Sequence, residues 1–356
     1  MVIMKENELK RYLFSLHKKL RKCRLPRVCY ANDLIEACPN HRNPIQECHS
    51  ISKEIVLRGI ARNGNVYILD HENLDQSGIN RPNYQIRQVG LRKALTFCGF
   101  CNFHDISLFS CFERRDINLD ETSLASISFR SIAFEAWCLE NELVRLKQGQ
   151  EAIKRDFPRA YEKNTQAFEG EIAFAAEPRK KAKETLHKIA TILGQQTYNA
   201  IRHCTIRFSD PPPVMGCSAF LPQFNLDGRV IWRDARYSCS REDARSRMII
   251  MSSHRDETSY VYIFSWLRYS QGMDVPGRLF QDLAGRTGSA QRDALVRMIF
   301  WYIGRIIISP DWSDNNPKLQ NFQLRALTQG RFAQNYPPAI TGIGASFPQI
   351  ENIQLS

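Results

Sequence analysis

Two short motifs of the same kind constrain the fold of this chain more than any other feature. Cys38-Pro-Asn-His41 and Cys101-Asn-Phe-His104 are both Cys-x2-His pairs. A two-residue spacer lets both side chains of a tight turn bind one tetrahedral ion, and sulfur with imidazole nitrogen is a ligand set that suits zinc. The sequence therefore predicts that two distant segments fold together around one structural zinc ion.

Other assignments of these residues stay open. Cys48 would replace His41 if that histidine does not bind the ion, and Cys98 would replace Cys101. The 59 residues between His41 and Cys101 exceed the spacing of compact zinc fingers. The alternative without metal is that the cysteines fill the core while the histidines are surface or capping groups.

The segments around the two motifs support the metal reading. Asn63-Gly64 stands between apolar runs in "EIVLRGIARNGNVYILD" (54–70), which predicts a β-hairpin. "CGFCNFHDISLFSCFE" (98–113) predicts a short helix that starts near the His-Asp pair. The order of ligands, hairpin, ligands and helix is that of a treble-clef zinc finger. Structural zinc contributes on the order of 10 kcal/mol to the folding of small units with little core.

The middle of the chain is predicted to be helical. Leucines repeat at helical spacing over 5–22, and a long helical pattern runs from Glu121 to about Asp156 with Asp120 or Thr122 as its N-cap. A second helix is predicted over about 178–199. These helices form a connector.

Beyond residue 210 the pattern changes to short β-type runs bounded by turn residues, with a hairpin around 254–257. Helices return at about 275–285 and 290–307. The fold class predicted is α+β. A length of 356 residues favours several units, which we place at 1–118 (zinc-binding module), 119–200 (helical connector) and 201–356 (α+β domain of unknown role).

Charge points to a polyanionic partner. The chain has 49 Lys and Arg against 37 Asp and Glu, a net charge of +12, and such an excess favours nucleic acid. The most apolar stretch, 298–308, is interrupted by Arg305 and is too short to span a bilayer, so no membrane association is expected. Eleven cysteines without an export signal favour a reducing, cytoplasmic location.

Other polar residues carry weaker signals. Glu135 lies in an apolar helical region, where it could be a third acidic ligand but is expected to pair with an arginine. His254 falls in the expected hairpin turn, which favours a structural role. Because phosphate-loop, dinucleotide-binding and Ser-His-Asp patterns are absent from the sequence, nucleotide hydrolysis, hydride transfer and acyl transfer receive little support.

The residues around the metal motifs resemble the HNH nuclease module, a ββα-metal fold. The matching parts are "CHSIS" (48–52), "GNVY" (64–67) and "FCNFHD" (100–105) at a helix start. The resemblance implies that His49 is the general base and that Asp105 binds a catalytic Mg²⁺ or Mn²⁺ ion. It leaves Cys38, His41, Cys101 and His104 as the structural zinc ligands.

His104 stands where the family has a second cysteine and Asp105 where it has a ligand histidine, and two further departures bear on catalysis. Cys48 stands where the family often has an Asp or His ligand, and a soft thiolate is a poor ligand for Mg²⁺. The family's middle asparagine, which orients the base, has no clear counterpart. Both departures put catalytic competence in question.

A second resemblance covers most of the chain. "HSIS", "GLRKALTFCGFCNFHDISLFSCFE" and "MIFWYIGRIIISPDW" are similar to a widespread group of bacterial proteins with an "AH-S-IS" then "GFC-HD-LF" pattern and no established activity. This resemblance supports only the idea that His49, Cys101, His104 and Asp105 act as a set.

Two functions follow as expectations. The first is a metal-dependent nuclease acting on DNA or RNA in bacterial defence, where HNH modules often occur. The second is a non-catalytic zinc-stabilised module that binds nucleic acid or a protein partner. Convergence of His49 and Asp105 on an open site distinct from the zinc would favour the first.

Overall fold

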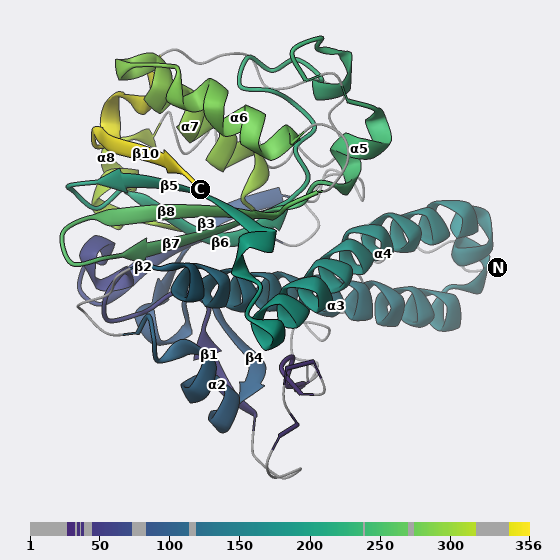
Figure 1. The fold of residues 1–356 in the computed structure, drawn as a ribbon. Helices are drawn as coiled ribbons and strands as arrows, with labels where there is room; N and C mark the ends of the chain where they lie inside the picture. The colour runs from purple at the N-terminus through teal and green to yellow at the C-terminus, as the bar shows by residue number, and fades with distance from the viewer. Residues whose placement is uncertain are drawn as a thin grey trace.

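An eight-stranded antiparallel sheet forms the centre of the structure (Figure 1). The structure is a computed structural model that describes residues 27–32, 34–35, 37–38, 45–72, 83–113, 119–237, 239–269, 274–317 and 342–356. The architecture is mixed α+β, which confirms the predicted fold class at this level. The predicted helix over 5–22 and the candidate ligand His41 lie outside the described residues.

The strand order in this sheet is β10-β5-β8-β7-β6-β9-β2-β3, and every neighbouring pair is antiparallel. The strands are β2 (Asn65–Glu72), β3 (Asn83–Gly90), β5 (Ile201–Phe208), β6 (Val214–Phe220), β7 (Ile249–Arg255), β8 (Tyr260–Leu267), β9 (Ile306–Ile308) and β10 (Ile350–Leu355). All eight side chains of β8 are buried, as expected for a central strand that is rich in aromatic and β-branched residues and covered on both faces.

The predicted hairpin around residues 254–257 is confirmed by the pairing of β7 with β8. One carboxylate oxygen of Asp256 accepts hydrogen bonds from the Thr258 and Ser259 amides in the turn. His254 is buried, and its Nε2–H donates to the carbonyl of Phe112 at 3.1 Å. Its role is therefore to join the end of β7 to the segment after α2 (Asn102–Phe109).

Helices cover both faces of the sheet. α6 (Val275–Ala284) and α7 (Gly288–Tyr302) lie on one face, and α3 (Glu121–Asp156) lies on the other (Figure 1). Two shorter helices, α5 (Arg241–Ser246) and α8 (Pro310–Asn315), lie toward the ends of the sheet. Asp120 caps α3 by accepting a hydrogen bond from the Ser123 amide at 2.8 Å, which selects one of the two predicted capping residues.

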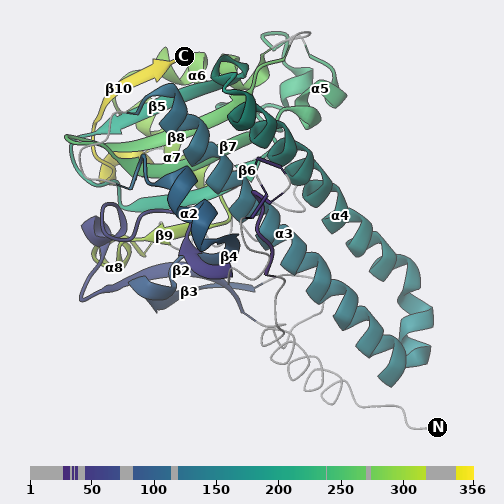
Figure 2. The same cartoon turned by 60° about the horizontal axis from the view of Figure 1, so that its bottom comes forward.

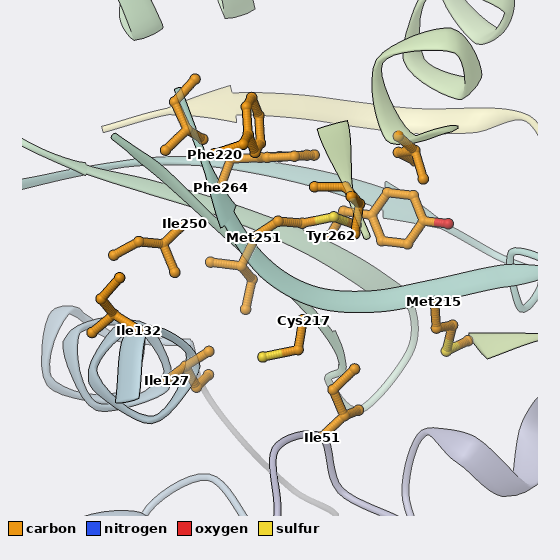
Figure 3. Close-up of a cluster of buried hydrophobic side chains, with 14 of the residues drawn as sticks. Ile51, Ile127, Ile132, Met215, Cys217, Phe220, Ile250, Met251, Tyr262 and Phe264 are labelled. Carbon is orange, nitrogen blue, oxygen red and sulfur yellow. The ribbon is translucent and has the colours of Figure 1, made fainter. Parts of the chain in front are cut away.

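The first turns of α3 are buried on all sides. Its residues from 123 to 136 contact β6 and β7 of the large sheet, and they also contact a smaller unit on the opposite side. Figure 3 shows Ile127 and Ile132 of α3 in the same cluster as Cys217 and Met251 of the sheet, together with Ile51. The small unit and the large sheet therefore share one hydrophobic core.

A helical hairpin extends from this core. α4 (Pro158–Gln195) runs back antiparallel to α3, and the far halves of both helices extend away from the sheet (Figure 2). The second helix thus begins some twenty residues before its predicted start, with Pro158 at the first helical turn, where proline is tolerated. The sequence after Phe157 is rich in charged residues, and for that reason the helix start at Pro158 was not predicted.

The small unit has a strand, strand, helix order. β1 (Ile45–His49) pairs antiparallel with β4 (Thr96–Cys101), and α2 follows β4 directly. His49 lies opposite Thr96 at the end of the ladder. Between these two strands the chain leaves to form β2 and β3 of the large sheet.

Of the hairpin predicted over 54–70, the turn is present but the strand before it is not. Asn63 and Gly64 both have positive φ (52° and 71°), and Arg62 and Asn65 exchange two backbone hydrogen bonds across them. The residues before the turn form a short 3₁₀ helix (Leu57–Ile60) whose Leu57 and Ile60 are buried, so β2 pairs with β3 instead. The module boundary at residue 118 stays a prediction, although strands from both sides of it pair in one sheet.

Candidate metal centre

Four side chains from three parts of the small unit converge on one point. Cys29 and Cys38 come from the turns that precede β1, Cys101 ends β4, and His104 lies in the first turn of α2. Their ligand atoms all lie within 4.8 Å of one another. This Cys₃His group could hold a metal ion.

The distances fit a tetrahedral zinc ion. The Sγ atoms of Cys38 and Cys101 are 3.7 Å apart, and Nδ1 of His104 lies 3.3, 3.6 and 3.3 Å from the sulfurs of Cys29, Cys38 and Cys101. With Zn–S near 2.3 Å and Zn–N near 2.0–2.1 Å, a regular tetrahedron separates two sulfurs by about 3.8 Å and sulfur from nitrogen by about 3.5 Å. The four atoms therefore surround a point that a zinc ion fits, with all four positions filled by protein.

Backbone contacts hold the ligands in place. The Cys101 amide donates to the sulfur of Cys29 at 3.4 Å, and the Tyr30 amide donates to the Gly99 carbonyl at 2.9 Å. The Cys38 amide donates to the side-chain oxygen of Asn32 at 2.9 Å. Such second contacts orient metal ligands, so the turns that carry Cys29 and Cys38 are fixed against β4.

The protein environment alone favours neutral thiols here. Burial raises the pKa of the Cys29 thiol, and burial together with the neighbouring thiols raises the pKa of Cys38 to about 12. A zinc ion reverses this preference because it binds thiolates and displaces their protons.

The structure brings three of the predicted ligands together and supplies a different fourth. Cys38, Cys101 and His104 belong to the group, and Cys29 completes it. Cys48, the expected substitute for His41, is buried with its thiol directed to the Phe97 carbonyl at 3.5 Å and is not a member. The two matched Cys-x2-His motifs led to the prediction of His41 as a ligand in place of Cys29. The sequence indicates Cys29 only through its position in a cysteine-rich stretch.

A cavity of about 350 Å³ lies beside the metal centre. His49, from the end of β1, and Asp105, from the first turn of α2, both line it, as do Cys48, Lys53, Glu113 and Arg130. The two residues predicted to act together thus face one cavity that is distinct from the closed Cys₃His group.

His49 has the hydrogen bond that a general base needs. Its Nδ1–H donates to the Ala94 carbonyl at 3.0 Å, an assignment that leaves Nε2 with the lone pair. Burial lowers the pKa of His49, and the positive charges of Lys53 and Arg130 lower it further, against the opposing effect of the Ala94 hydrogen bond. The imidazole is therefore neutral near pH 7 and can accept a proton at Nε2.

Asp105 is bound to a buried arginine. Arg130 of α3 donates to Asp105 from Nη2 at 3.0 Å and to Glu113 from Nη1 at 2.7 Å. The arginine side chain is 2% exposed, against 30% for Asp105 and 43% for Glu113. Its guanidinium also lies over the rings of Phe109 and Phe112, 4.4 and 5.4 Å from their centroids. No pattern in the sequence indicates this contact.

The described residues give no support for the expected Mg²⁺ or Mn²⁺ ion at Asp105. Within the described ranges, the Cys₃His set is the one group of three or more His, Cys, Asp or Glu ligand atoms close enough to hold an ion. Asp105 already binds a guanidinium, and the neighbouring Cys48 offers a soft sulfur.

Glu135 takes a different role from either one predicted. Its buried carboxylate accepts hydrogen bonds from the Ser218 hydroxyl at 2.9 Å and the Ala219 amide at 3.4 Å. Both donors belong to β6. Glu135 therefore joins α3 to the sheet through neutral donors.

Comparison with protein-family models, curated proteins and solved structures found no match to this chain. None of the described helices has the length and apolar composition needed to cross a membrane.

Proposed function

We propose that this protein is a nuclease that cleaves phosphodiester bonds in the cavity beside a structural zinc centre. The observation that carries the proposal is that His49 and Asp105 line one cavity within a strand, strand, helix unit pinned by a Cys₃His group. The same order of base, second strand and ligand-bearing helix characterises the HNH module that the sequence resembles. In this proposal the unit is a treble-clef zinc finger.

Zinc has a structural role in the proposal. All four of its positions are filled by protein atoms, so no position is open to a substrate or water. The four ligands tie the start of α2 and the end of β4 to the turns before β1. The ion thereby holds Asp105, which follows the ligand His104, at a fixed place relative to His49.

His49 is the proposed general base. Its neutral imidazole takes a proton from the nucleophile that attacks phosphorus, and the attack places negative charge on the phosphate oxygens. A nearby cation must stabilise that charge. The HNH resemblance assigns this role to a divalent ion on Asp105, whereas the structure offers Arg130 at the same place.

Charge supports a nucleic-acid partner. Residues 1–27 contain nine Lys and Arg and two Glu, so this segment carries +7 of the chain's +12. The segment ends two residues before the zinc ligand Cys29. A basic stretch that precedes a zinc ligand in the chain favours a phosphate backbone as partner. A place in bacterial defence rests on the resemblance alone.

A second function is favoured by a specific observation. Arg130 binds Asp105 and Glu113, two of the four carboxylates that line the cavity, and an inactive descendant of a nuclease could keep this arrangement as a purely structural ion-pair network. The protein would then be a zinc-stabilised module that binds nucleic acid or a protein partner without cleaving it.

A cleavage assay separates the two functions. Zinc-loaded wild type, His49→Ala and His187→Ala would be incubated with labelled RNA and DNA, with and without Mg²⁺ or Mn²⁺. His187 is an exposed histidine on α4 and serves as the matched control. We expect cleavage by wild type and His187→Ala and a loss of about 100-fold or more in His49→Ala. Binding without cleavage under every condition would establish the non-catalytic function instead.

A further inference from the structure

We infer that Arg130 supplies the positive charge for the reaction in place of a divalent ion, and that the substrate is RNA cleaved by its own 2′-hydroxyl. This inference rests on the proposed nuclease function and names its substrate class. It predicts an activity that needs the structural zinc and no second metal.

The first support is that Arg130 keeps donors for an anion. A guanidinium has five N–H donors, and the two carboxylates take one from Nη1 and one from Nη2. Nε is shielded from solvent, so the remaining hydrogens of Nη1 and Nη2 are the donors left for an anion. Arg130 lines the cavity although its side chain is almost fully buried, so it forms part of the cavity floor.

The second support is that water screens the acidic side chains of the cavity more than it screens Arg130. Asp105 and Glu113 are partly exposed, so water screens their charge, whereas the guanidinium is 2% exposed and acts through protein. The lining also holds Lys53, which pairs with Glu54 at 2.9 Å, and Glu47; both glutamates are exposed, so water screens their charge as well. A phosphate oxygen that contacts Arg130 would meet the charge of a buried guanidinium, while water screens the four carboxylates of the lining.

The third support comes from the chemistry available without a second metal. Water is a weak nucleophile unless a metal ion acidifies it. RNA carries its own nucleophile next to the phosphorus, and a reaction within one molecule has an effective molarity of 10⁵ M or more, as an order of magnitude, when well oriented. A neutral histidine can take the proton of this hydroxyl and an arginine can bind the phosphate oxygens, and DNA lacks the hydroxyl.

The proposed step balances as follows. Nε2 of His49 takes the proton of the 2′-hydroxyl, the O2′–P bond forms, and the P–O5′ bond breaks with its electron pair leaving on O5′. The donors of Arg130 bind the non-bridging phosphate oxygens while charge builds on them. Solvent returns a proton to O5′, which gives a 2′,3′-cyclic phosphate and a free 5′-hydroxyl.

The substrate test uses protein freed of loosely bound ions and checked to retain one zinc per chain. Single-stranded RNA, 2′-O-methyl RNA and DNA of one sequence would be incubated without added Mg²⁺ or Mn²⁺. We expect cleavage of RNA alone, with cyclic phosphate ends. The 2′-O-methyl strand should stay intact because its nucleophile is blocked.

Variants test the role of Arg130. Arg130→Gln should lose about 100-fold or more in rate, as on removal of a transition-state donor, and Arg130→Lys should recover part of the loss. Asp105→Asn should lose no more than about tenfold, because the amide oxygen still accepts a hydrogen bond from Arg130. Zinc content and melting temperature would show that each variant is folded, and Asp105→Asn with the substrate series decides the matter if Arg130→Gln does not fold.

The outcomes separate the inference from the proposed function. Cleavage that requires Mg²⁺ or Mn²⁺, accepts DNA or 2′-O-methyl RNA, or disappears in Asp105→Asn would overturn the inference and leave the nuclease function standing. A lack of cleavage under all conditions would overturn both.

Discussion

The sulfur of Cys38 lies 3.7 Å from the sulfur of Cys101, although 63 positions of sequence separate the two residues. Between them the chain forms β1, leaves to build two strands of the large sheet, and returns as β4. A metal ion bound to both sulfurs would hold together the two ends of this long segment.

Removal of a zinc ligand should release the metal and destabilise the fold. We expect Cys29→Ser to lower bound zinc well below one ion per chain, and the free energy of unfolding by at least about 3 kcal/mol, since structural zinc contributes on the order of 10 kcal/mol. Metal analysis and urea unfolding would measure both. Cys98→Ser is the matched control, because Cys98 lies on the same strand as Cys101 but outside the group. Equal zinc content in the two variants would refute the assignment of Cys29.

The pH dependence of cleavage should report His49. Burial and the nearby positive charges lower its pKa, so the histidine stays neutral and active below its ordinary value of about 6.5. The rate should therefore fall only when the pH drops below about 6.5. Lys53→Gln removes one of these positive charges and should move the acid midpoint of kcat/KM to higher pH. A midpoint that stays in place in this variant would contradict the role of His49 as base.

Stability should fall in acid because of His203. This histidine is buried on β5 beside Ser265, 2.8 Å from its hydroxyl, and burial lowers its pKa to about 4. Between about pH 6.5 and 4 the unfolded chain binds a proton that the folded one does not, so the free energy of unfolding decreases as the pH falls through this range, by up to about 3 kcal/mol. Urea unfolding of His203→Gln should show a flatter pH profile, whereas the exposed His187→Gln should keep the wild-type slope.

Two glycines should respond in opposite directions to alanine. Gly64 has a φ of +71° in the turn before β2, so Gly64→Ala should destabilise the fold by about 1 kcal/mol. Gly170 lies within α4 with open space around it, so Gly170→Ala should stabilise by about 0.5–1 kcal/mol. Chemical unfolding of both variants checks the signs, and a stabilising Gly64→Ala would contradict the turn described here.

Local patterns in the sequence were sufficient for several parts of the fold. The turn at residues 254–257, the cap at Asp120 and the ligand pair Cys101 and His104 all depend on neighbours within a few positions. Turn chemistry, capping and ligand spacing act over such distances, so a sequence can show them.

The remaining parts depend on contacts between distant segments. Arg130 reaches Glu113 and Asp105 across 17 and 25 residues, and Cys29 meets His104 across 75. No periodicity or spacing connects such partners. The turn at Asn63-Gly64 is present, but the strand expected before it is not. β2 pairs instead with β3 and with β9, which lies near the other end of the chain.

The pairing of Tyr67 with Ile308 also sets an order of events during biosynthesis. All four metal ligands have been made once His104 is added, so the ion can be captured early. One edge of β2 then stays unpaired until β9 emerges, which takes roughly 10–40 s at about 5–20 residues per second. During that interval the nascent chain carries an open strand edge that can join other chains, and a chaperone that shields this edge on the ribosome would raise the yield of native protein.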